Sequence, residues 1–141
     1  MRGKSIYFAA PIHKEQDAKN NMELITLLRK LGFDVWAPQE AGIATDIAQA
    51  EGITRDEARR RILHYDLCAM KRCDICLAYI DRDEGWSDGQ LFEMGWFVGA
   101  NKPLIIYNPR NLDLTLMSEF TCDFMVIERN IDRLVEILGR V

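Results

Sequence analysis

The sequence Ser87-Asp-Gly-Gln-Leu-Phe-Glu-Met-Gly-Trp-Phe-Val-Gly-Ala100 predicts a helix over residues 87–100. Ser87 followed three residues later by Gln90 is a capping-box pattern, which is typical of a helix N-terminus. The positions from 91 to 100 are apolar on almost every face, so we expect this helix to be largely buried. Glu93 is the only charged residue among them, and burial of a carboxylate is unfavourable unless it is paired, hydrogen-bonded or protonated. Glu93 therefore has either a structural partner or a functional role.

Short apolar runs alternate with predicted helices along the whole chain. The runs that predict strands are residues 5–10, 33–36, 75–80, 103–107 and 124–127. The helices are expected at residues 13–31, 54–71, 87–100, 112–119 and 131–138. Continuous apolar strands between helices are typical of a parallel sheet that is covered on both faces. The sequence thus predicts one α/β domain, residues 1–141, with a doubly wound, flavodoxin-like, five-stranded parallel sheet that binds ligands at the carboxyl ends of its strands.

The composition is that of an ordinary globular protein of one domain. The 141 residues are 48% hydrophobic and 28% charged. The net charge of -4 argues against a nucleic-acid polymer or a membrane surface as the main partner, because both are anionic. No apolar segment suits a signal peptide or a membrane span, so we expect a cytoplasmic protein.

Cysteine and acidic residues raise the question of a metal or redox site. Cys73 and Cys76 have the C-x-x-C spacing of a redox pair or half a zinc site, but no second pair or paired histidine follows. The acidic loop at residues 81–84 lacks the spacing of an EF-hand. We therefore expect reduced, buried cysteines, a solvated acidic loop, and neither a metal nor a cofactor.

A second acid, Asp66, lies on an apolar stripe of its predicted helix. Ile62, Asp66 and Met70 follow one another at intervals of four residues and therefore share a face. Asp66 is either a partly exposed acid at the edge of this stripe or a carboxylate that meets Glu93 in one pocket. Two carboxylates in different environments can divide the roles of nucleophile and acid, as in retaining glycoside hydrolysis. Tyr7, near the end of the first strand, could donate a hydrogen bond to Glu93 or simply fill the core.

Four segments of the chain carry a family resemblance. They are Ile6-Tyr-Phe-Ala-Ala-Pro11, Asp66-x7-Asp74-Ile-Cys-Leu-Ala-Tyr79, Gly89-x-x-Phe-Glu93-Met-Gly95 and Lys102-Pro103. Together and in this order they resemble the nucleoside 2-deoxyribosyltransferase family, over residues 6 to about 118. The resemblance implies a flavodoxin-like fold and cleavage of the N-glycosidic bond of nucleosides or nucleotides.

The resemblance also implies a role for each candidate catalytic residue. Glu93 would be the nucleophile that attacks C1′ of the sugar, Tyr7 would orient it, and Asp66 would assist protonation of the departing base. Gln39, after the second strand, matches a loop position that contacts the base. Further substrate contacts are implied for Ser87, Asp88, Gly89, Thr115 and Ser118.

Two positions bear on the branch of the family. Transferases, which pass the sugar to a second base, have an Asp that binds the free 5′-hydroxyl where this chain has Ser87. They also take an Asn from a neighbouring subunit, within a segment that here runs from Thr115 to Ser118. A hydroxyl and the N–H groups of a helix start suit a phosphate, which a carboxylate would repel. These features favour a 5′-monophosphate hydrolase. The contribution of a neighbouring subunit implies a homodimer or larger homo-oligomer with a shared site. Asp88, one residue after Ser87, could approach a free 5′-hydroxyl, so the transferase is the alternative.

Two other classes of protein share the predicted fold. A phosphoacceptor receiver domain needs an acidic pair after the first strand, where this chain has Ala9-Ala10-Pro11. A non-catalytic nucleotide sensor needs no nucleophile, so a buried Glu93 beside Tyr7 would argue against it. The sensor is the alternative from another functional class.

Overall fold

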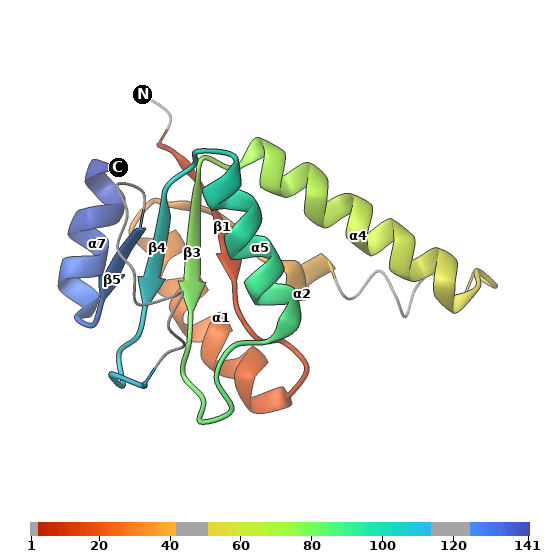
Figure 1. Ribbon diagram of the computed structural model, residues 1–141, viewed down its shortest axis with the longest axis horizontal. Coiled ribbons are helices and arrows are strands. Elements are labelled where there is room, and N and C mark those ends of the chain that lie inside the picture. The colour runs from red at the N-terminus through yellow and green to blue at the C-terminus, as the bar shows by residue number, and fades with distance from the viewer. Residues whose placement is uncertain (1–2, 42–50, 114–124) are drawn as a thin grey trace.

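The computed structural model describes residues 3–41, 51–113 and 125–141 and has an α/β fold (Figure 1). Its five-stranded parallel sheet has the strand order β2-β1-β3-β4-β5. The strands are β1 (Ser5–Ala9), β2 (Asp34–Trp36), β3 (Ile75–Tyr79), β4 (Leu104–Tyr107) and β5 (Met125–Glu128). The helices are α1 (Glu15–Lys30), α2 (Pro38–Ala41), α4 (Arg55–Arg72), α5 (Asp88–Gly99) and α7 (Ile131–Arg140). The predicted flavodoxin-like fold is confirmed, and its strand order reverses between β1 and β3.

Helices cover both faces of the sheet (Figure 1). On one face, α1 and α7 pack against alternate strand residues such as Ile6 and Phe8. On the other face, α4 and α5 pack against the intervening residues, which include Tyr7, Ala9 and Cys76. Side chains alternate along a strand, so β1 contributes to both cores. Tyr7 thus lies on the face that α4 and α5 cover, and Phe8 lies on the opposite face.

Helix α4 is attached to the sheet mainly at its C-terminal end. Of its 18 residues only Ala58, Ala69 and Met70 are buried, and two of these lie in the last turns. The N-terminal half extends away from the sheet (Figure 1). Leu63 and Tyr65 are consequently exposed on this helix.

The prediction that α5 is largely buried is wrong. Gln90, Met94 and Phe97 face the core, whereas Leu91 and Phe92 are 44% and 57% exposed. A helix on the surface of a sheet buries only one stripe, so a helix that is apolar nearly all round leaves apolar side chains in solvent. Such a surface is available to a partner.

Some expectations fall outside the described residues. The helix expected at residues 112–119 lies mostly in the stretch 114–124, which is not described. Among the helices that are described, none is both long enough and apolar enough to cross a membrane.

Candidate active site

Glu93 lies on the inner side of α5, one turn from the buried residues Gln90 and Phe97. Burial raises the pKa of the Glu93 carboxyl to about 8, and the nearby charge of Asp66 adds to the rise. The Tyr7 hydroxyl has a weaker effect in the opposite direction. Glu93 is therefore largely protonated near neutral pH, which is unusual for a glutamate and common at functional sites.

Asp66 is half-buried on α4, one turn before the buried Met70. Burial raises the pKa of its carboxyl to about 6. The charge of Asp66 is close enough to raise the pKa values of both Glu93 and Tyr7. In the structure Asp66 is thus half-buried at the edge of its apolar stripe, and its charge acts on Glu93 from a different helix.

Tyr7 brings a third polar group to this place from β1. Its fully buried ring stacks on Trp36, with 5.1 Å between ring centres, and contacts Phe97 at 5.5 Å. Burial, and then the charge of Glu93, hold the pKa of the Tyr7 hydroxyl far above its usual range, so the group stays protonated. No hydrogen bond of standard geometry joins this hydroxyl to a described residue, although Tyr7 and Glu93 are near enough to shift each other's pKa.

Four buried side-chain oxygens have no hydrogen-bond partner within the described ranges. They belong to Tyr7, Asp66, Gln90 and Glu93. A buried polar group without a partner lowers stability by about 1–3 kcal/mol, so native proteins contain few of them. Three of the four residues are those that the sequence proposes as catalytic. Unpaired polar atoms around one carboxyl group are what a ligand site requires, since the ligand completes their hydrogen bonds.

Gln90 is a buried polar residue that the sequence presents only as a helix cap. Its backbone N–H does donate to the Ser87 hydroxyl (3.2 Å), but its side chain points elsewhere. The amide Nε2 donates to the carbonyl oxygens of Ala9 (2.9 Å) and Tyr79 (2.8 Å), at the ends of β1 and β3. The sequence does indicate that Gln90 and Glu93 share one side of the helix, because residues three positions apart are neighbours on a helix.

The expected substrate contacts Ser87, Asp88 and Gly89 form the start of α5. Ser87 is the N-cap, and the next two residues are exposed. The first N–H groups of a helix have no partners within it and carry the positive end of the helix dipole. A Cβ atom on Gly89 would meet nothing within 4 Å. Packing against the described chain therefore does not require this glycine, and the backbone is accessible to a ligand.

The predicted substrate contacts Gln39, Thr115 and Ser118 are not placed at Glu93 by the described structure. Both ends of the Gln39 amide bond to α1, since its oxygen accepts from Asn21 (2.9 Å) and its nitrogen donates to Ala18 (3.2 Å). A contact between Gln39 and a base would compete with these bonds. Thr115 and Ser118 lie outside the described residues.

The acidic loop after β3 is held by ion pairs. Asp83 pairs with Arg110 at 2.5 Å, and Glu84 pairs with Lys14. No cluster of three or more His, Cys, Asp or Glu that could hold a metal ion occurs in residues 3–41, 51–113 and 125–141. The acids of this loop are thus matched by cations of the chain itself.

The expectation that the cysteines are buried is only partly correct. Cys73 and Cys76 are buried free thiols, whereas Cys68 is exposed on α4. Cys76 on β3 pairs in register with Tyr7 on β1. Burial, and then the charge of Glu93, raise the pKa of the Cys76 thiol, so a small neutral group lies beside the carboxyl.

Fold and site together define an α/β protein with a partly buried pair of carboxyl groups on the face that α4 and α5 share. The family model described as nucleoside 2-deoxyribosyltransferase matches residues 6–130. The chain therefore belongs to the nucleoside 2-deoxyribosyltransferase family, as the resemblance of its segments implies. None of the curated proteins compared with the chain matches it.

Solved structures share the fold at low sequence identity. The 2-deoxyribosyltransferase of Bacillus psychrosaccharolyticus matches with a TM-score of 0.75 and 22% identity over 96% of each chain. That of Leishmania mexicana matches with a TM-score of 0.63 and 16% identity over 97% of each chain. The CMP N-glycosidase of Clostridium botulinum matches with a TM-score of 0.55 and 19% identity, over 96% of this chain and 98% of the other. At these identities the similarity establishes the fold.

Proposed function

We propose that this protein cleaves the N-glycosidic bond of (2′-deoxy)nucleoside 5′-monophosphates and releases the base by double displacement through Glu93. The observation that carries the proposal is the group of unpaired buried oxygens on Tyr7, Asp66 and Glu93. A glutamate with a purely structural role would have its buried oxygens hydrogen-bonded, because a buried polar group without a partner lowers stability. Carboxyl groups with pKa values of about 8 and about 6 also suit a pair that shares one proton. A non-catalytic sensor would have no use for such a pair.

In the first step, a carboxylate oxygen of Glu93 attacks C1′ and forms a glycosyl ester. The bond between C1′ and the base nitrogen breaks, and its electron pair leaves with the base. Asp66 gives its proton to the base, which departs neutral. The reactive form of the pair therefore has Glu93 ionised and Asp66 protonated, which is the less populated of the two singly protonated forms, because Glu93 has the higher pKa. Tyr7 stabilises the ionised Glu93 by donating a hydrogen bond.

In the second step, water attacks C1′ from the side that the base has left. The Asp66 carboxylate takes a proton from this water, and the bond between C1′ and Glu93 breaks with its electron pair returning to the carboxylate. Two inversions at C1′ give net retention. A second base in place of water would make the same residues a transferase, so the choice between the two reactions depends on the acceptor and on the 5′-group.

The start of α5 supports a phosphate rather than a free 5′-hydroxyl. Ser87 is neutral, and the N–H groups of the first helical turn attract an anion. The open space around Gly89 leaves room for phosphate oxygens. One structure with the same fold is described as a CMP N-glycosidase, so hydrolysis of a nucleoside monophosphate is compatible with this architecture.

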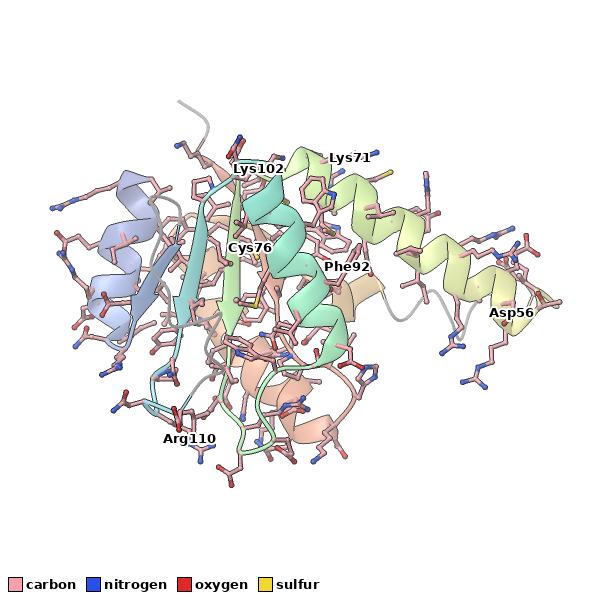
Figure 2. The ribbon with its side chains drawn as sticks, in the orientation of Figure 1. Asp56, Lys71, Cys76, Phe92, Lys102 and Arg110 are labelled. Atoms are coloured by element: carbon pink, nitrogen blue, oxygen red, sulfur yellow. The ribbon has the colours of Figure 1, made fainter. Side chains whose placement is uncertain are left out.

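The proposal includes a homodimer or larger homo-oligomer with a shared site. Leu63 and Tyr65 on α4, and Leu91 and Phe92 on α5, are all at least 44% exposed. Figure 2 shows Phe92 on the outer surface of α5, the helix that carries Glu93. A second copy would cover these apolar side chains, and the segment from 115 to 118 of that copy would complete the site. A fully active protein that sediments as a monomer would contradict this part of the proposal.

Base release from matched substrates tests the proposed reaction. Each nucleoside, 2′-deoxynucleoside and corresponding 5′-monophosphate is incubated with the protein, with and without a second free base, and the products are separated by chromatography. We expect release from the monophosphates only, at a rate that added base does not change. Exchange of bases on free 2′-deoxynucleosides would establish a transferase instead, and release from neither set would favour the sensor.

A charge substitution at the helix start tests the phosphate site separately. Ser87→Asp keeps a good N-cap but places a carboxylate beside the phosphate, so we expect kcat/KM for monophosphates to fall by about 10–100-fold. Thr54→Asp is the matched control, because it makes the same kind of change at the N-cap of α4. Equal effects of the two substitutions would remove Ser87 from the phosphate site.

A further inference from the structure

Lys102 follows α5 and reaches the C-terminal end of α4. Its ammonium group donates to the backbone carbonyls of Met70 (3.1 Å), Lys71 (2.7 Å) and Cys73 (2.7 Å). The last carbonyls of a helix have no partners within it and form the negative end of the helix dipole, so a cation is favourable there. The same ammonium lies 5.6 Å from the ring centre of Trp96 on α5. Figure 2 shows Lys102 where the ends of α4 and α5 meet.

The backbone of Lys102 is fixed by α5. Asn101 has a φ of 56°, the left-handed conformation that commonly ends a helix. The N–H of Lys102 donates to Phe97 (3.0 Å), and the N–H of Asn101 donates to Val98 (3.1 Å), which is a Schellman arrangement. Lys102 therefore caps the C-terminus of α5 with its backbone N–H and the C-terminus of α4 with its ammonium group.

Glu93 on α5 and Asp66 on α4 each lie one helical turn before a carbonyl that accepts a hydrogen bond from Lys102. The part of α4 before Asp66 extends away from the sheet, with Ala58 as its only buried residue (Figure 1). The position of Asp66 therefore depends on how the last turn of α4 is held.

We propose that Lys102 is a positioning residue, which sets the separation of the Asp66 and Glu93 carboxyl groups by tying the end of α4 to the end of α5. The inference rests on the proposed function, because it concerns the same carboxyl pair. Three backbone carbonyls occupy the three N–H groups of the ammonium, so Lys102 has no donor left for a substrate and acts through the helices. A displacement of about 1 Å in such a pair is enough to lower a rate by about 10²-fold.

Substitution of Lys102 tests this role against a matched lysine. Lys102→Met removes the ammonium and keeps an unbranched apolar side chain. Lys71→Met removes a lysine charge from the same end of α4, where Lys71 is exposed and its carbonyl is unchanged by the substitution. We expect kcat for base release to fall by about 10–100-fold in Lys102→Met with KM nearly unchanged, and to stay within about twofold in Lys71→Met. Lys102→Arg, which keeps a cation and several donors, should recover most of the loss.

A second measurement does not depend on turnover. Carboxyl-carbon NMR follows the titration of Glu93 in each variant. The pKa of Glu93 should fall in Lys102→Met, because Asp66 moves away and its charge raises that pKa less. A loss of stability alone lowers the folded fraction, which circular dichroism reports, and does not move the pKa of the folded protein.

The outcomes distinguish the two proposals. If Glu93 titrates alike in Lys102→Met and Lys71→Met, Lys102 only stabilises the fold and the inference is wrong, even where the wild-type protein releases base. If the titration shifts but the wild-type protein releases no base, the positioning role stands and the proposed function is wrong. Should Lys102→Met not fold, Lys102→Gln is titrated in its place against the same control. It lacks the charge and has two N–H donors for the three carbonyls, so the pKa of Glu93 should still fall, by less than in Lys102→Met.

Discussion

The two faces of the sheet are built on the same strands but differ in what they bury. On the face covered by α1 and α7, Ile6, Phe8 and Leu77 pack against leucine and isoleucine side chains of those helices. On the face covered by α4 and α5, the same strands contribute Tyr7 and Cys76. All four unpaired buried oxygens found in the described residues belong to β1, α4 and α5, on this second face.

The difference shows how one sheet serves both stability and chemistry. Unpaired buried polar groups lower stability, so they persist only where the surrounding structure holds them in place. The α1 and α7 face supplies apolar burial, which offsets the unfavourable groups on the other face. The buried polar residues of α1 have partners, since Asp17 pairs with Arg82 and Asn21 donates to Gln39. We therefore expect substitutions on the first face to change stability, and polar substitutions on the second face to change activity.

Glu93→Gln should have the largest effect on activity. The amide has nearly the same shape as the carboxyl group but cannot form the glycosyl ester, so kcat for base release should fall by at least about 10³-fold. Single-turnover assays with a 5′-monophosphate measure this loss, with circular dichroism as the check on folding. Full activity in Glu93→Gln would exclude double displacement through this residue.

The same substitution should make the protein more stable at alkaline pH. Burial raises the pKa of Glu93 in the folded protein to about 8, whereas the ordinary value is 4.5. The folded state therefore binds this proton more tightly, and wild-type stability falls as the pH rises from 4.5 to about 8. Glutamine does not ionise, so the advantage of Glu93→Gln over wild type should grow across this range by about 4 kcal/mol. Urea unfolding at pH 5 and at pH 9, about the ends of this range, provides the comparison.

The pH dependence of kcat/KM should be bell-shaped if the two carboxyl groups share one proton. Below about pH 6 both groups are protonated and no nucleophile is present, and above about pH 8 both are ionised and no acid is present. In Asp66→Asn the alkaline limb should disappear, because only Glu93 remains to titrate. An Asp66→Asn profile that kept both limbs would assign them to other groups.

The sequence predicts the fold more completely than the site. Continuous apolar runs between helices suffice for the parallel sheet, because few other architectures bury both faces of every strand. Strand boundaries differ slightly, since β4 begins at Leu104 and not at Pro103, which has no N–H to donate to a neighbouring strand. The resemblance of the segments around Glu93 adds the candidate catalytic residues.

Two features of the second face depend on contacts that no local pattern contains. Helix α5 is apolar nearly all round, so periodicity does not show which side meets the sheet, and Phe92 is exposed. The side chain of Gln90 bonds to Ala9 and Tyr79, which lie on two strands that meet only in the folded protein. Local propensity predicts the cap at Ser87 and misses these longer-range bonds.

Among these substitutions, Tyr7→Phe should have the smallest effect on kcat. It also allows the two faces to be compared at neighbouring residues of β1. It removes the hydroxyl that is proposed to stabilise the ionised Glu93 by a hydrogen bond, so we expect kcat to fall by about tenfold. The free energy of unfolding should rise by about 1–3 kcal/mol, because the substitution removes a buried hydroxyl that has no partner in the described structure. Phe8→Leu, one residue along β1 on the opposite face, should instead lose about 1–2 kcal/mol of that free energy and keep the kcat of the folded enzyme. Urea unfolding and single-turnover assays measure both quantities. If the two variants exchanged these effects, the division between the faces would be wrong, because neighbouring residues on one strand differ mainly in the face they occupy.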